Sequence, residues 1–144
     1  MALLGGGVGG AGNPVGGSFT GPAQSLELVG DQSGDHKFGY AYSGVIEPGA
    51  GPTTVLDFTT GNYLCVGRFE MNADFKGGGG SDYGVTIKLN GTTIIFEQDI
   101  ANNWLAGDNE FHVIIPPYTA VEGLLSDGGS NKDMNLNFTA RVYR

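Results

Sequence analysis

Two histidines and one cysteine, His36, His112 and Cys65, offer the widest catalytic chemistry in this chain. Neither histidine stands in a motif with a nucleophile, and the serine-hydrolase, H-E-x-x-H zinc and phosphate-loop motifs are absent. Cys65 lies among strand-forming residues without a cationic neighbour that would lower its pKa, so we interpret it as a small buried hydrophobe. We therefore predict no catalytic residue and no cofactor.

Two polar clusters contain residue types that bind metals. They are Asp31, Asp35 and His36 in the first, and Asp127, Asn131 and Asp133 in the second. Their spacing fits neither an EF-hand nor a zinc pattern, so we interpret both as solvated turns and predict no metal site. Gly77 to Gly80 is followed by Ser81 and not by lysine, which favours a surface loop over a phosphate cradle. With 15 acidic residues the chain offers many carboxylate pairs, and none stands out as a glycosidase pair.

The length, charge and cysteine count narrow the class of protein. A chain of 144 residues suits one domain with one hydrophobic core. Its net charge of -8 disfavours binding to nucleic acid and to anionic membranes. A single cysteine excludes an intramolecular disulfide. No signal-like or membrane-spanning run is visible, so we expect a soluble protein made without export.

Short apolar runs with a period of two, separated by glycine, proline and asparagine, predict strands along most of the chain. The expected strands are Ser25 to Val29, Gly39 to Ile46, Thr53 to Thr59, Tyr63 to Asn72, Val85 to Leu89, Thr92 to Gln98, Phe111 to Ile115, Tyr118 to Leu125, and Met134 to Tyr143. Asn90-Gly91 predicts a type I′ hairpin. Across that hairpin we expect Ile94 and Phe96 to face inward and Ile95 to face outward.

The pattern from Phe38 onward gives about eight strands and no helix of three or more turns, which excludes parallel α/β folds. Two packed antiparallel sheets fit this count, as a jelly roll or as an immunoglobulin-like sandwich. The jelly roll is preferred because the paired cysteines and buried tryptophan of antibody-type domains are absent. We thus predict an all-β domain, a single jelly roll over residues 25 to 144, preceded by an extended arm.

The arm is residues 1 to 24, with nine glycines, two prolines and no charged side chain. Its apolar residues follow neither a helical nor a strand period, so it has no core of its own and would be a flexible coil when free. They are Leu3, Leu4, Val8, Val15 and Phe19. We predict that these side chains contact a partner on which the arm becomes ordered.

Several short stretches, in their order along the chain, carry a family resemblance. They are Gly17-Ser18-Phe19-Thr20-Gly21-Pro22 leading into Leu26-Glu27 and Gly30-Asp31, Tyr40-Ala41-Tyr42-Ser43-Gly44, Leu56-Asp57-Phe58-Thr59-Thr60-Gly61, Ile114-Ile115-Pro116-Pro117, and Arg141-Val142-Tyr143. In these the chain resembles small jelly-roll virion proteins of phages and other viruses of aquatic microbes. The resemblance implies a structural role in the particle, with no catalytic residue to carry over.

The expected function is therefore that of a capsid decoration, cement or minor capsid protein, which is assembled into virions in the host cytoplasm. Its expected partners are the major capsid protein or other virion proteins, and further copies of itself, with a trimer favoured. Two alternatives remain open. One is a fibre, spike or tail domain that binds host glycans through exposed Tyr83, Trp104 and Tyr118. The other is a small sugar-acting enzyme.

Overall fold

The computed structural model describes residues 25–30, 36–73, 83–99, 109–129 and 133–144. These residues form nine strands and contain no helix, which confirms the all-β prediction. The strands are β1 Glu27–Gly30, β2 His36–Tyr42, β3 Thr53–Thr59, β4 Leu64–Ala73, β5 Tyr83–Leu89, β6 Thr92–Asp99, β7 Asn109–Ile115, β8 Ala120–Ser126 and β9 Met134–Tyr143. The expected loop around Trp104 and the arm, residues 1 to 24, lie outside the described residues.

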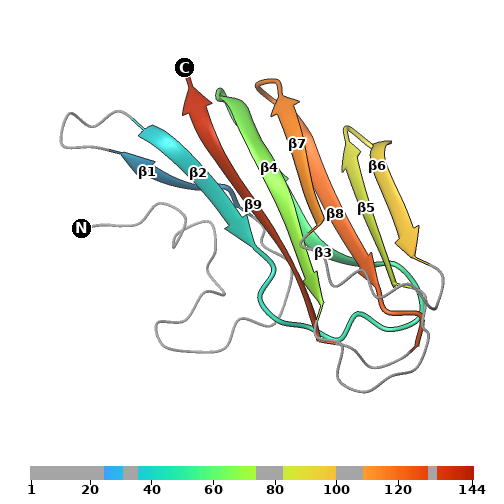
Figure 1. Cartoon of the computed structure of the whole chain (residues 1–144). Coiled ribbons are helices and arrows are strands. Elements are labelled where there is room, and N and C mark those ends of the chain that lie inside the picture. The colour runs from blue at the N-terminus through green and yellow to red at the C-terminus, as the bar shows by residue number, and fades with distance from the viewer. Residues whose placement is uncertain (1–24, 31–35, 74–82, 100–108, 130–132) are drawn as a thin grey trace.

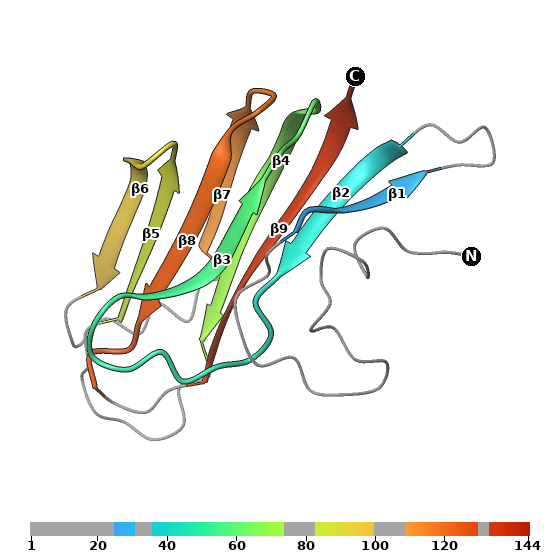
Figure 2. The ribbon, with the colours of Figure 1, turned by 180° about the vertical axis from the view of Figure 1, so that it is seen from behind.

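The strands form two antiparallel sheets that pack face to face as a sandwich (Figure 1, Figure 2). One sheet has five strands in the order β1-β2-β9-β4-β7, and the other has four in the order β3-β8-β5-β6. The pairing is nested along the chain. β2 pairs with β9, β3 with β8, β4 with β7 and β5 with β6. Three further pairings, β1 with β2, β4 with β9 and β5 with β8, complete the sheets.

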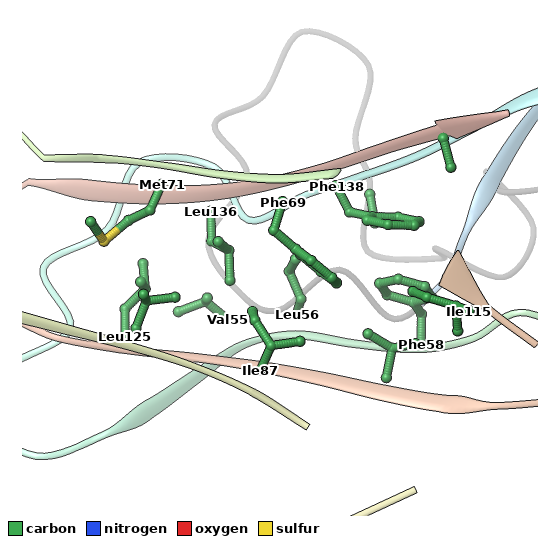
Figure 3. Close-up of a cluster of buried hydrophobic side chains, with 14 of the residues drawn as sticks. Val55, Leu56, Phe58, Phe69, Met71, Ile87, Ile115, Leu125, Leu136 and Phe138 are labelled. Carbon is green, nitrogen blue, oxygen red and sulfur yellow. The ribbon is translucent and has the colours of Figure 1, made fainter. Parts of the chain in front are cut away.

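The core lies between the sheets and is made by every second residue of most strands (Figure 3). β9 shows this alternation most clearly, as the sequence predicted: Met134, Leu136 and Phe138 are fully buried, while the residues between them are only partly buried. The Phe138 ring centroid lies 4.7 Å from that of Phe69 in the same sheet and 5.5 Å from that of Phe58 in the facing sheet. Phe138 therefore joins the two layers.

Asn90 and Gly91 both have positive φ, 50° and 79°, which confirms the type I′ turn between β5 and β6. The predicted faces of β6 are wrong, because Ile87 pairs with Ile95 whereas Lys88 pairs with Thr93. Ile94 is the extra residue of this bulge, and it reverses the alternation beyond it. Phe96 consequently lies opposite Thr86 and is 65% exposed, while Ile95 packs against the core.

Two predicted strands are longer than the observed ones, and backbone geometry explains both differences. β2 ends at Tyr42, and Gly44 then takes a φ of 72°, so Ile46 makes only an isolated bridge with Met134. β8 begins at Ala120 because Tyr118 has a φ of 59°, which is not a strand conformation. In β3 a bulge buries both Val55 and Leu56, where strict alternation would separate them.

Candidate interaction surfaces

Cys65 is completely buried on the inner face of β4, as predicted for a small hydrophobe. Burial raises the pKa of its thiol from 9.0 to about 11. The thiolate is the nucleophilic form of cysteine, and it is scarce at neutral pH in such a position. Cys65 therefore contributes packing and not chemistry.

The histidines lie on different strands of the five-stranded sheet, His36 at the start of β2 and His112 within β7. The ring of His36 makes an edge contact with Tyr63 at a centroid distance of 5.9 Å. His112 Nε2 lies 2.8 Å from Glu110 Oε1, and the side chain of His112 is 76% exposed. Within the described part of the chain, no three His, Cys, Asp or Glu side chains are placed to hold a metal ion.

Asp127 follows β8 and is fully buried, which a solvated turn residue would not be. Its Oδ1 accepts a hydrogen bond of 2.7 Å from the amide of Gly129, and its own amide donates to the carbonyl of Gly49 at 2.9 Å. Gly128 and Gly129 both have positive φ. The interpretation of Asp127 as a solvated residue is therefore wrong, since its carboxylate closes the turn. Asn131, from the same predicted cluster, lies outside the described residues.

The three aromatic residues predicted for glycan recognition do not form one described site. Tyr83 is only 6% exposed and is part of the core at the start of β5, so its predicted place on an exposed surface is wrong. Tyr118 is 77% exposed. Trp104 lies outside the described residues, as do the arm residues predicted to contact a partner, which are Leu3, Leu4, Val8, Val15 and Phe19.

Tyr118 stands on a turn that a neighbouring turn holds in place. The amide of Tyr118 donates to the carbonyl of Gly61. The buried Thr60 hydroxyl donates to the carbonyl of Pro116 at 2.9 Å and accepts from the amide of Thr119 at 3.0 Å. The exposed ring of Tyr118 is thus carried by a backbone fixed on both sides.

A row of apolar side chains crosses the outer face of the five-stranded sheet, a feature that the sequence did not predict. Strand register aligns one residue from each strand, in the order Val29, Phe38, Arg141, Val66 and Ile114. We call these five residues the apolar row. Its four apolar members are 47%, 49%, 41% and 68% exposed in the same order. Their neighbours in sequence, such as Cys65 and Ile115, are fully buried, so the row points away from the core.

Arg141 lies at the centre of the apolar row, on β9. Its guanidinium carbon is 5.7 Å from the centroid of the Phe38 ring, a cation–π arrangement. The side chain therefore leans from β9 toward β2.

A second row runs beside the apolar row and is polar. It contains Glu27, Tyr40, Thr139, Arg68 and His112, again one residue from each strand. Arg68 bridges two carboxylates, with Nε 3.4 Å from Glu70 and Nη1 3.1 Å from Glu110. The pKa of Tyr40 is raised, chiefly by burial and further by the nearby Glu27 carboxylate and by Tyr42. We call this set the polar row.

Strand β2 carries aromatic rings at successive outward positions, Phe38, Tyr40 and Tyr42. The rings of Tyr40 and Tyr42 are 4.8 Å apart with a tilt of 31°. Their alternation is visible in the sequence as F-x-Y-x-Y, although the sequence does not show which strands lie beside β2. Arginine, tyrosine and phenylalanine are the residue types that protein interfaces favour.

Comparisons of the chain with protein-family models, with curated proteins and with solved structures found no match. The described residues include no helix of the length and apolar character that a membrane span requires.

Proposed function

We propose that this chain is a non-enzymatic structural protein of a virus particle, a capsid decoration, cement or minor capsid protein that attaches through residues 1 to 24. Its partners are the major capsid protein or other virion proteins, together with further copies of itself. It is incorporated into virions in the host cytoplasm, and it uses no cofactor.

The observation that carries this proposal is the nested strand pairing. The strands pair from the outside of the sequence inward, beginning with β2 and β9 and ending with β5 and β6. This order supports a jelly roll, in which a long antiparallel hairpin is wrapped into two sheets. Viral capsid domains are a major use of that fold. The immunoglobulin-like alternative receives less support, because its sheets have a different strand order.

The outer surface of the domain also supports an assembly role. Six of the ten exposed large hydrophobic side chains among the described residues lie on the outer face of the five-stranded sheet: Val29, Phe38, Tyr42, Val66, Ile114 and Tyr143. Burying apolar area of this kind contributes roughly 25 cal/mol per Å². A surface that gains so much from being covered suits a protein that works in contact with others.

Deletion of Met1 to Phe19 tests the attachment. We expect the shortened chain to keep its far-UV circular dichroism spectrum, because all nine described strands lie at Glu27 or beyond. Co-purification with particles should be lost. Normal incorporation of a folded shortened chain would contradict the proposal.

The exposed, backbone-fixed ring of Tyr118 favours one alternative, a glycan-binding fibre, spike or tail domain. Aromatic rings recognise sugars by stacking, and the sequence offers Trp104 as a second candidate ring. A glycan array with the wild-type chain and with Tyr118→Ala and Trp104→Ala decides this point. Reproducible glycan binding that both substitutions abolish would establish the alternative, and a blank array would remove it.

A further inference from the structure

We infer that the outer face of the five-stranded sheet binds the same face of a second copy of this chain, about a two-fold axis parallel to β9. This inference specifies the self-association named in the proposed function, and it does not depend on the virion role, since it concerns the purified chain alone. It rests on the strand order of this sheet, which Figure 1 shows, and on the side chains that the strand register places on its outer face.

The position of β9 gives the face its symmetry. β9 is the central strand, with β2 and β1 on one side and β4 and β7 on the other. A two-fold axis above β9 and parallel to it lays β9 over its own copy, β2 over β4, and β1 over β7. Rows of side chains across the sheet then face the same rows in the second copy.

The two-fold rotation places the apolar side chains of the apolar row against apolar side chains of the same row in the second copy. Phe38 on β2 faces Val66 on β4 of the second copy, and Val29 on β1 faces Ile114 on β7. Because the axis repeats each contact, the interface has four such apolar contacts, from side chains that are 41% to 68% exposed in the isolated chain.

The polar row also places polar groups that can interact opposite each other. Glu27 on β1 faces His112 on β7 of the second copy, and Tyr40 on β2 faces Arg68 on β4. The first contact pairs a carboxylate with an imidazole, and the second places a guanidinium against an aromatic ring. In the next row, Tyr42 on β2 faces Glu70 on β4, a hydroxyl donor against a carboxylate.

Arg141 on β9 faces Arg141 of the second copy, so two positive charges come close to the axis. The observed conformation of the side chain separates these charges. The guanidinium leans toward Phe38 on β2 of its own chain. The two-fold axis sends the guanidinium of the second copy to the opposite side of β9. The two positive charges thus lie over different Phe38 rings instead of facing each other.

The size of the face suits a stable dimer. Five strands spaced about 4.8 Å apart make a face roughly 20 to 25 Å wide. Covering it removes several hundred Å² from each copy, comparable with the ~800 Å² per partner in a standard interface. The matching face of the four-stranded sheet lacks this pattern, since its central charges, Lys88 and Glu122, pair with each other at 3.3 Å.

Sedimentation velocity of the full-length chain over a range of concentrations tests the inference. We compare the wild type with Ile114→Asp, and use Phe96→Asp as a matched control because Phe96 is 65% exposed and Ile114 is 68% exposed, on the outer faces of different sheets. A reversible dimer is expected for the wild type and the control. Ile114→Asp should raise the dimer dissociation constant at least about tenfold, because it buries a carboxylate among apolar groups.

Chemical cross-linking gives a second test that does not require the aspartate variant to fold. Thr139 lies at the middle of the polar row on β9, so it faces itself across the axis. Thr139→Cys should be linked into covalent dimers by a short bis-maleimide, whereas Thr86→Cys on the other sheet should not. The native Cys65 is fully buried and should not react.

Several results would overturn the inference. These are a wild-type chain that is monomeric at all concentrations, a trimer, an Ile114→Asp chain that dimerises like the wild type, or equal cross-linking of the two cysteine variants. A monomeric chain whose Ile114→Asp variant fails to enter particles would assign the face to another virion protein, and would also overturn it. Arm deletion leaves the prediction of a dimer unchanged, so failure of the attachment proposal is a separate result.

Discussion

The outer faces of the two sheets have the same relation to the core but carry different side chains. Across the five-stranded sheet run exposed valine, isoleucine and phenylalanine, with tyrosines beside them. The four-stranded sheet instead presents Thr54, Lys88 and Glu122, joined by a hydrogen bond of 3.0 Å and an ion pair of 3.3 Å, with the exposed Phe96 on its edge strand β6. Folding requires only the inner faces, so we attribute the apolar outer face to the contact between copies inferred above.

The substitution with the largest expected effect, Phe138→Ala, tests whether the inner faces of the two sheets form one shared core. Phe138→Ala removes a fully buried ring that packs on Phe69 and Phe58, from both sheets. We expect the free energy of unfolding to fall by about 3 to 5 kcal/mol. Urea unfolding followed by tyrosine fluorescence and by circular dichroism should show one coincident transition. Separate transitions for the two probes would mean that the sheets do not share a single cooperative core.

The next largest effect is a loss of stability at alkaline pH, which tests how completely Cys65 is buried. Burial raises the pKa of Cys65 to about 11, so folding favours the neutral thiol. This stabilisation is fully present below the unfolded pKa of 9.0 and is lost as pH rises through the folded value. Between about pH 8 and pH 10.5, the free energy of unfolding should fall by about 2 kcal/mol through this thiol.

Cys65→Ala is the control for the alkaline effect. The variant should be less stable at every pH, because a cavity replaces the sulfur, but it should lose the part of the pH dependence that Cys65 supplies. Urea unfolding of both proteins at several alkaline pH values measures the difference in slope. Parallel curves for the two proteins would show that Cys65 is not as buried as the structure places it.

The smallest effect concerns an exposed aromatic residue that belongs to neither outer face. Tyr118 has a φ of 59°, which costs a non-glycine residue on the order of 1 kcal/mol. Tyr118→Gly should leave the free energy of unfolding within about 1 kcal/mol, because relief of strain offsets the entropy of glycine. Tyr118→Val should be less stable by about 1 to 2 kcal/mol, since a branched side chain tolerates this conformation poorly. A valine variant as stable as the glycine variant would argue against the turn geometry.

Local patterns predicted much of the fold. The alternation of Met134 to Tyr143 identified β9 and its buried side, and Asn90-Gly91 identified the hairpin. The bulge at Ile94 was not predictable, because its position depends on pairing with β5 and not on local propensity. For that reason Phe96 was assigned to the wrong face.

The apolar row of the candidate interface could not be predicted from the sequence, for a different reason. Each member of the apolar row is a single apolar residue in its own strand, and such residues occur on most protein surfaces. Only the lateral order of strands, which places Val29 and Ile114 at opposite ends of one line, joins them. That order is set by pairing between distant parts of the chain. The prediction for Tyr83 was wrong in the opposite direction, since the sequence placed it on an exposed loop, whereas its ring is part of the core.

Oxidative footprinting of the associated chain, compared with the dilute chain, tests most directly whether the two outer faces have different roles. Phe38, Tyr42 and Tyr143, which are 49%, 49% and 47% exposed, report on the five-stranded sheet, and Phe96, at 65%, reports on the four-stranded sheet. We predict that oxidation of the first three falls on association while oxidation of Phe96 is unchanged. Protection of Phe96 with unchanged oxidation of Phe38, Tyr42 and Tyr143 would contradict the account.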